Sequence, residues 1–264
     1  MVIKQSEPYK YGYNPITELE GYHADMQMDV GIIKISGDDN YSNSEAKERA
    51  ILLIEGEVTF KWESNEVTVV RNSCFDENPV CLHLPKDVKV TIEGRRESEL
   101  CYQAVYNDKV FESKLFTQEM GVSDVFGKDT LGNTSIRTVR TVIDDDIAPY
   151  SNLVIGEVIN HPGKWSSYPP HHHVQPEVYH YRFLPEQGFG VSIVGDEAQK
   201  IENRSTTCVT SSLVHPQCSA PGYAMYYIWM IPHIKEKRWL KDRTFETQHE
   251  WLLDPDAKIW SINS

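Results

Sequence analysis

The feature that most constrains the fold of this chain is a series of short runs rich in β-branched and aromatic residues, separated by Pro, Gly, Asn or Asp. Such runs are typical of strands, and the residues between them are typical of turns. Their fairly even spacing favours a sandwich or barrel over a parallel α/β sheet. We therefore predict an all-β fold, with strands near residues 67–70, 88–92, 100–106, 153–159, 179–183, 190–194, 206–210 and 223–231.

A further run, at residues 49–62, predicts a β-hairpin. Two strand-like stretches, residues 51–54 and 58–62, lie on either side of Gly56. Because glycine accepts the backbone angles of tight turns, a glycine between two such stretches indicates that the chain reverses there.

The strand rhythm breaks over residues 109–132, which are rich in polar and turn-forming residues. We place a domain boundary in this stretch, so that residues 1–130 and 131–264 form two domains of ordinary size. Helical periodicity is weak, and only residues 44–49 and 118–126 resemble short helices.

The charge of the chain excludes several classes of partner. Its 264 residues include 26 Lys and Arg against 39 Asp and Glu, which gives a net charge of −13. Such an acidic surface repels nucleic acid, and a small anionic partner would need a local basic pocket. No apolar run approaches the roughly 20 residues that span a bilayer, and no signal peptide begins the sequence. We expect neither nucleic-acid nor membrane binding.

The cysteines indicate a reducing compartment. The chain has five of them, an odd number, and no two form a Cys-x-x-Cys pair. This pattern favours reduced, mostly buried thiols over a disulfide framework or a zinc cluster, so we expect a cytoplasmic protein.

Histidines concentrate in the second half, and they predict a metal site. His171 and His173 would share one face of an extended strand, and Glu177 begins the next strand after a turn at Pro176. Two imidazoles and a carboxylate that converge in this way suit Zn, Mn or Fe(II). His215, on a later segment, is the candidate for a fourth ligand. The alternative is a solvated histidine-rich loop.

The spacing His-x-His, then Glu, then a distant His resembles the first cupin motif. The wider sequence resembles the family of 5-deoxy-glucuronate isomerase, of myo-inositol catabolism, and 5-keto-4-deoxyuronate isomerase, of pectin breakdown. The resemblance is close over residues 130–264 and fainter before them. It rests on residues 163–173, 177–181, 187–189, 221–223, 226–227 and 249–253.

This resemblance implies two tandem cupin domains, each a double-stranded β-helix or jelly roll, of which the first has lost its metal ligands. It implies one divalent metal ion (Zn, Mn or Fe) held by His171, His173, Glu177 and His215. The activity implied is the aldose–ketose isomerisation of a deoxy-uronate, a small-molecule sugar acid. One departure is that residues 210–214 replace the Pro-x-Gly turn that usually precedes the last histidine.

Such a reaction needs a proton relay, for which Tyr179 and Tyr223 are candidates. Tyr179 shares the inward face of Glu177 by strand alternation, although an aromatic side chain there could simply fill the barrel. The substrate carboxylate needs a cation, and a guanidinium group matches it with two hydrogen bonds. The candidates are Arg137, Arg140 and Arg238, for each of which a surface salt bridge is the alternative.

Two other functions stay open: a cupin dioxygenase that uses Fe(II), and a non-catalytic bicupin that binds sugar acids. We also expect the two halves to pack together and the protein to form a homo-oligomer; apolar strands such as residues 224–232 could line either an inter-domain or an inter-subunit interface.

Overall fold

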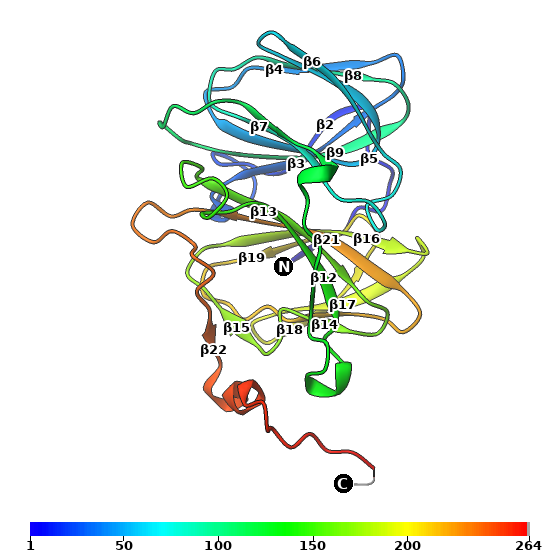
Figure 1. Cartoon of the computed structure of the whole chain (residues 1–264), viewed down its shortest axis with the longest axis vertical. Coiled ribbons are helices and arrows are strands. Elements are labelled where there is room, and N and C mark those ends of the chain that lie inside the picture. Colours follow the sequence, from blue (N-terminus) through cyan, green and yellow to red (C-terminus); the bar gives the residue numbers. More distant parts are fainter. Residues whose placement is uncertain (263–264) are drawn as a thin grey trace.

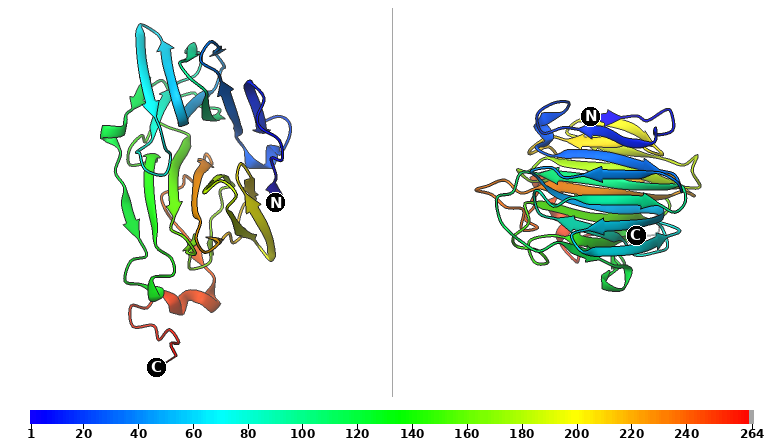
Figure 2. Two further views of the ribbon diagram at one scale, coloured as in Figure 1. Left: turned by 90° about the vertical axis from the view of Figure 1, so that its right-hand side faces the viewer. Right: turned by 90° about the horizontal axis from the view of Figure 1, so that it is seen from above.

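Antiparallel β-strands form most of the chain, as expected, in a computed structural model that describes residues 1–262. Two curled sheets lie one above the other, and the C-terminal segment runs down the side of the lower one and away from it (Figure 1). The strands of the two sheets run in roughly the same direction when the molecule is seen from above (Figure 2). This is the aligned packing that twisted sheets adopt.

The N-terminal barrel is one nine-stranded sheet. Its strands are β2 (Gly12–Thr17), β3 (Asp29–Ile35), β4 (Asn40–Asn43), β5 (Glu48–Trp62), β6 (Asn65–Arg71), β7 (Val80–Leu84), β8 (Val90–Gly94), β9 (Ser98–Val105) and β10 (Lys114–Phe116).

The C-terminal barrel combines a seven-stranded sheet with two smaller ones. The large sheet has the order β1 (Val2–Ile3), β19 (Thr206–Val209), β16 (Glu177–Leu184), β21 (Ala224–Pro232), β13 (Leu153–Asn160), β12 (Arg137–Ile143) and β11 (Asp124–Phe126). A four-stranded sheet contains β14 (Trp165–Ser166), β20 (Gln217–Ser219), β17 (Phe189–Val194) and β18 (Glu197–Glu202), and β15 (His171–His172) pairs with β22 (Thr244–Phe245).

The boundary near residue 130 stays a prediction. Two strands on its N-terminal side, β1 and β11, pair with strands of the C-terminal sheet. The helical expectations were wrong in part. Residues 44–49 contain no helix, and residues 118–126 contain only the short 3-10 helix η2 (Gln118–Met120) before β11. The other 3-10 helices are η1 (Ala24–Met26), η3 (Leu131–Asn133) and η4 (Thr247–Leu253).

The hairpin predicted at residues 49–62 was wrong, because these residues form the single strand β5. The backbone at Gly56 has φ +130°, and a Cβ there would lie 2.1 Å from Ser98 Oγ. The register of β5 against β9 shifts between Leu53 and Glu55. Gly56 therefore bends the strand instead of reversing it. Before the bend β5 pairs with β7 and β9, and after it with β6 and β8.

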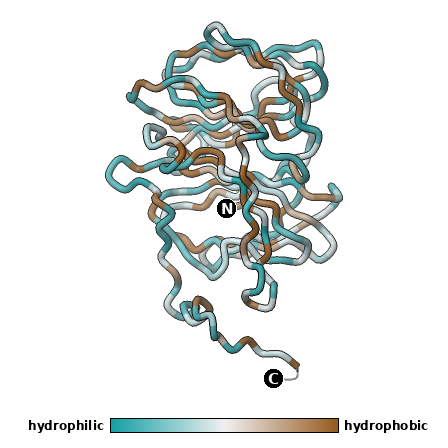
Figure 3. Tube along the Cα trace, in the orientation of Figure 1, coloured by the Kyte–Doolittle hydropathy of each residue, from teal (hydrophilic) through white to brown (hydrophobic). Residues whose placement is uncertain are grey.

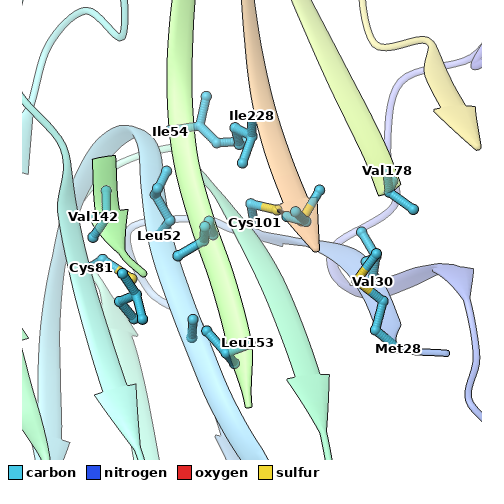
Figure 4. Close-up of a cluster of buried hydrophobic side chains, with 14 of the residues drawn as sticks. Met28, Val30, Leu52, Ile54, Cys81, Cys101, Val142, Leu153, Val178 and Ile228 are labelled. Atoms are coloured by element: carbon cyan, nitrogen blue, oxygen red, sulfur yellow. Dashed lines mark hydrogen bonds between the residues drawn. The ribbon is translucent and has the colours of Figure 1, made fainter. Parts of the chain in front are cut away.

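Both faces of the central strands are buried, because the two sheets pack on each other and each barrel has its own interior. On β5, Leu52 and Ile54 face the other sheet, whereas Ile51 and Leu53 face into the N-terminal barrel. Figure 4 shows the shared core, to which β13 and β21 contribute residues such as Leu153 and Ile228. Hydrophobic stretches accordingly lie on the stacked strands and hydrophilic ones on the loops (Figure 3).

Buried charges also join the two barrels. Arg71 on β6 donates to both carboxylate oxygens of Glu157 on β13, at 2.7 and 2.8 Å, and both side chains are fully buried. Tyr226 donates to the same carboxylate at 2.5 Å. Because a buried charge without its partner is costly, this cluster requires the two sheets to be stacked in one register.

The five cysteines are free thiols, as expected, and four of them are buried. Within residues 1–262, no helix has the length and apolar character needed to cross a bilayer.

Candidate functional site

The C-terminal barrel encloses a cavity of about 530 Å³. One wall is β21, where Tyr227, Trp229 and Ile231 alternate with residues that face the other sheet. Trp229 lies flat against β13, since a Cβ at Gly156 would be 2.5 Å from its ring. A glycine at this position thus allows a large aromatic side chain to form the back of the cavity.

Three predicted ligands meet in this cavity. Glu177 begins β16, His173 lies in the turn just before it, and His215 lies in the loop that leads to β20. One ligand atom from each residue lies within 4.8 Å of the others, and this is the one such group found within residues 1–262. The turn at Pro176 allows the histidine before it and the carboxylate after it to face the same point.

The protons of these imidazoles are fixed by the backbone. His173 Nδ1 lies 3.0 Å from the carbonyl oxygen of Gln175, and His215 Nδ1 lies 2.8 Å from that of Leu213. Because a carbonyl oxygen only accepts, each Nδ1 carries the hydrogen and each Nε2 presents its lone pair. This arrangement is the one that orients histidines toward metal ions.

The free nitrogens face Glu177. Its Oε2 lies 3.1 Å from His173 Nε2 and 3.4 Å from His215 Nε2. A carboxylate oxygen and an imidazole lone pair repel each other unless a cation, either a proton or a metal ion, lies between them. Two imidazoles and one carboxylate are a donor set that divalent transition metals prefer, so the residues present fit a metal ion.

His171 lies beside this group. It lines the same cavity, its ring centroid is 5.2 Å from that of His215, and its Nδ1 lies 2.8 Å from the carbonyl oxygen of Pro169. Its Nε2 is therefore also free of hydrogen in the neutral form. The structure brings all four predicted ligands into one cavity, three of them in close contact.

Burial and charge adjust the pKa values of these groups in opposite directions. Burial opposes the ionised form of Glu177, but the neighbouring imidazoles of His173 and His215 outweigh it, so the pKa of Glu177 is lowered. Burial, with the nearby His215, lowers the pKa of His171 to about 3. Burial also lowers the pKa of His215. An ionised carboxylate beside neutral imidazoles is the state in which such residues bind metal ions.

Of the two predicted proton relays, Tyr179 lines the cavity and Tyr223 does not. The Tyr179 hydroxyl lies 3.3 Å from Ser167 Oγ. Tyr223 instead packs against Phe189, with ring centroids 6.1 Å apart. Sequence reasoning missed Tyr227, which lines the cavity and shares a hydrogen bond with Ser166.

Of the three predicted arginines, only Arg137 lines the cavity. Arg140 faces the other sheet, where it donates to the carbonyl oxygens of Cys74, Phe75 and Glu77 at 2.7 to 3.1 Å. We therefore leave Arg140 out of the substrate-binding set, because its donors are already used in joining the barrels.

Arg238 is also left out. It donates through Nε to Asp145 at 2.6 Å and through Nη2 to the carbonyl oxygen of Ser151 at 2.9 Å. These contacts hold it against the loop between β12 and β13, and it does not line the cavity.

The C-terminal segment contributes residues that sequence reasoning also missed. Trp239, Lys241, Arg243 and Phe245 line the cavity. The pairing of β22 with β15, in which Phe245 lies opposite His171, fixes this segment against the histidines. The segment has no regular period, so strand alternation could not have revealed it.

Comparison with known proteins gives a consistent result. The KduI/IolB family model matches residues 2–252. A 5-deoxy-glucuronate isomerase from Lacticaseibacillus casei is 24% identical over 269 residues, which cover 91% of this chain and 97% of that protein.

Solved structures show the same fold. An IolB-like protein from Salmonella typhimurium LT2 superposes with a TM-score of 0.85 at 20% identity, over 96% of this chain and 99% of that one. A cupin 2 conserved barrel domain protein from Leptotrichia buccalis superposes with a TM-score of 0.54 at 13% identity, over 88% of this chain and 96% of that one. The predicted bicupin fold is thereby confirmed.

Proposed function

The chain belongs to the KduI/IolB family, and on that premise we propose that it is a metal-dependent aldose–ketose isomerase of a deoxy-uronate, with 5-deoxy-glucuronate as substrate. The curated relative from Lacticaseibacillus casei, which carries the name of this activity, covers 91% of the chain. The family model, which matches residues 2–252, spans both barrels and all of the cavity-lining residues except Leu253.

The observation that carries the proposal is the convergence of His173, Glu177 and His215 in the cavity. We propose that these three residues and His171 hold one divalent ion, either Zn, Mn or Fe. Each of the three imidazoles is oriented by a backbone carbonyl oxygen, and the carboxylate is ionised. The cavity is also large enough for a six-carbon sugar acid beside the ligands.

An aldose–ketose isomerisation moves hydrogen between two neighbouring carbons while their carbonyl and hydroxyl groups exchange, so it needs no external oxidant. When bound, a divalent metal ion would stabilise the negative charge that develops on the two oxygens. The chain itself must orient the sugar, exclude water and move protons. The aromatic side chains of Tyr227, Trp229 and Trp239 line the cavity, where they would orient the open-chain sugar and exclude water.

Tyr179 is the proposed proton relay. Burial, with a smaller contribution from the charge of Glu177, raises the pKa of its hydroxyl well above the usual range. The hydroxyl is therefore protonated at neutral pH and can donate a hydrogen bond to a substrate oxygen. Ser167 Oγ, 3.3 Å away, can return a proton to it.

The test is NMR of the purified protein, with its metal content measured, after incubation with 5-deoxy-glucuronate and separately with 5-keto-4-deoxyuronate. We expect conversion of 5-deoxy-glucuronate to its ketose, and loss of conversion after chelation of the metal. Oxygen uptake is recorded in the same samples. Absence of conversion of both sugars would refute the isomerase proposal, and substrate-dependent oxygen uptake would favour the dioxygenase.

A further inference from the structure

Two guanidinium groups without acidic partners line the cavity. Arg137 lies on β12 and Arg243 lies just before β22, so they reach the cavity from different parts of the chain. Within residues 1–262, neither forms an ion pair with a carboxylate within 4.0 Å. In a chain with a net charge of −13, two unpaired cations at one cavity indicate an anionic ligand.

Arg137 is held in place by neutral contacts alone. Its Nη1 donates to the carbonyl oxygen of Ser135 at 2.9 Å, and its guanidinium carbon lies 5.9 Å from the centroid of the Phe126 ring. Burial lowers the pKa of Arg137, and the charge of Arg243 adds to that effect. The two like charges are thus close enough to oppose each other, a repulsion that a bound carboxylate would relieve.

Arg243 is held in place by its neighbours in the chain. Thr244 and Phe245 pair with His172 and His171, so the backbone beside Arg243 is anchored to the strand that carries a proposed metal ligand. Its side chain is exposed and lines the cavity, and within residues 1–262 it forms no hydrogen bond to the protein. Its five donors are therefore available.

The other charges near the cavity are accounted for. Lys241 forms ion pairs with Asp144 at 2.9 Å and Asp146 at 2.6 Å, so its charge is already balanced. Glu177 belongs to the metal-binding group. Asp124, exposed on β11, is the other carboxylate of the cavity lining, and no basic side chain of the described residues 1–262 lies within 4.0 Å of it. Apart from the proposed metal ligands, the charged residues of the lining are therefore the unpaired Arg137 and Arg243, the ion-paired Lys241 and the exposed Asp124.

We propose that Arg137 and Arg243 together bind the carboxylate of the sugar acid, and that Arg243 determines the preference of the site for uronates over neutral sugars. This inference rests on the proposed function for the identity of the substrate. A guanidinium group binds a carboxylate through two parallel hydrogen bonds, and two such groups lining one cavity can fix the end of the sugar that does not react. The reacting carbons are then directed toward His173, Glu177 and His215.

The kinetic test compares Arg243→Gln, Arg243→Lys and Arg137→Gln with the unchanged protein. Loss of a charge-assisted contact predicts that KM for 5-deoxy-glucuronate rises about 10- to 100-fold in Arg243→Gln, with kcat changed less than about threefold. Arg243→Lys should recover part of this loss, because it keeps the charge but not the two-pronged geometry. The matched control is Arg96→Gln in the N-terminal barrel, where Arg96 donates to Asn72 at 2.7 Å.

A binding test does not depend on turnover. Calorimetry with D-glucuronate and D-glucose, on metal-loaded protein with its melting temperature checked, should show tighter binding of the acid by the unchanged protein. Arg243→Gln should reduce the affinity for glucuronate about 10- to 100-fold and leave the affinity for glucose unchanged.

The outcomes separate the two proposals. If the protein converts no uronate but the glucuronate preference depends on Arg243, the isomerase proposal fails and the carboxylate site stands. If the protein converts 5-deoxy-glucuronate and Arg243→Gln keeps both KM and glucuronate affinity, the carboxylate site is overturned and the isomerase proposal stands. If the unchanged protein binds D-glucuronate and D-glucose with equal affinity, the proposed carboxylate site is also overturned.

Discussion

The two barrels share an architecture but differ in what fills them. The interior of the N-terminal barrel is packed with apolar side chains, among them Ile51, Val58 and Phe60 on β5. The C-terminal barrel places Glu177 and Tyr179 on the inward face of β16 and keeps an open cavity in front of them. Within residues 1–262, the candidate metal ligands belong to this second barrel alone.

The difference shows that one barrel mainly stabilises the protein while the other holds the candidate site. A barrel filled by aliphatic and aromatic side chains gains stability from burial, whereas a cavity lined with polar groups loses some of that stability. The stacked sheets share a core, so the packed barrel supports the open one. Substitutions in the first barrel should therefore change stability, and substitutions in the second should change chemistry.

The largest effect is expected from Phe60→Ala, which should cost about 3–5 kcal/mol of unfolding free energy through the cavity it creates. Urea denaturation of the metal-loaded protein measures it. The folded variant should keep its metal content and turnover per folded molecule. Val67→Ala on the exposed face of β6 is the control, and Ile51→Val is a milder core change of about 1 kcal/mol. If Phe60→Ala lost turnover while its unfolding free energy stayed unchanged, the N-terminal barrel would have to take part in the reaction.

Glu177→Gln should reduce both metal content and turnover, the latter by more than about 100-fold, because an amide oxygen is a weaker ligand than a carboxylate. Elemental analysis and the NMR assay measure the two quantities. Glu197→Gln, on exposed β18 of the same barrel, should change neither. A variant with full metal content and full turnover would contradict the proposed ligand set.

Tyr179→Phe removes one hydroxyl from the cavity and leaves the ring in place. Turnover should fall about 100-fold, the size typical of a lost proton relay, while metal content stays the same. Tyr223→Phe is the matched control outside the cavity and should retain turnover. Equal turnover of both variants would remove Tyr179 from the mechanism and leave it as a wall of the barrel.

A pH effect is expected where the barrels meet. His180 Nε2 accepts from Arg182 at 2.6 Å, and burial, together with the charge of Arg182, lowers the pKa of His180 well below the usual range. The unfolded chain takes up a proton near pH 6.5 and the folded chain does not. Stability should therefore be fully present above pH 6.5 and fall as the pH drops, by up to about 1.4 kcal/mol per pH unit.

His180→Gln keeps an acceptor for Arg182 and removes the titration. Urea denaturation between pH 7 and pH 5 should give a flatter pH dependence for this variant than for the unchanged protein. Identical slopes for the two proteins would show that His180 does not contribute to the acid sensitivity.

The smallest effect is expected from Arg238→Gln. The pair between Arg238 and Asp145 is partly exposed, and such pairs contribute up to about 1 kcal/mol. Turnover and KM should stay within about twofold of the unchanged protein. A large rise in KM would return Arg238 to the substrate-binding set, and would mean that the cavity extends toward the loop between β12 and β13.

Strand periodicity predicted much of this structure, because alternation and turn residues act locally. It predicted several strands of each barrel and the orientation of Tyr179 beside Glu177, but it missed others, among them β3, β7 and β12. It failed at β5, because Gly56 is equally suited to a turn and to a bend within a strand. The choice between these depends on the pairing of β5 with β6 and β8, which lie later in the chain.

The candidate metal ligands could be picked out because three of them lie within a few residues of one turn. The arginines that line the cavity were harder to predict from the sequence. Arg137 and Arg140 are three residues apart on one strand, so they face opposite sides, and only the packing of the sheets decides which side is the cavity. Arg243 could not be found, because its position depends on the pairing of an irregular segment with β15.

The most direct test of the account is anomalous diffraction from crystals of the protein loaded with Zn or Mn. We expect one strong peak in the C-terminal barrel, about 2.0–2.2 Å from Nε2 of His171, His173 and His215 and from the Glu177 carboxylate, and none inside the N-terminal barrel. A metal ion bound elsewhere, or no peak beside these four side chains, would contradict the proposed metal site.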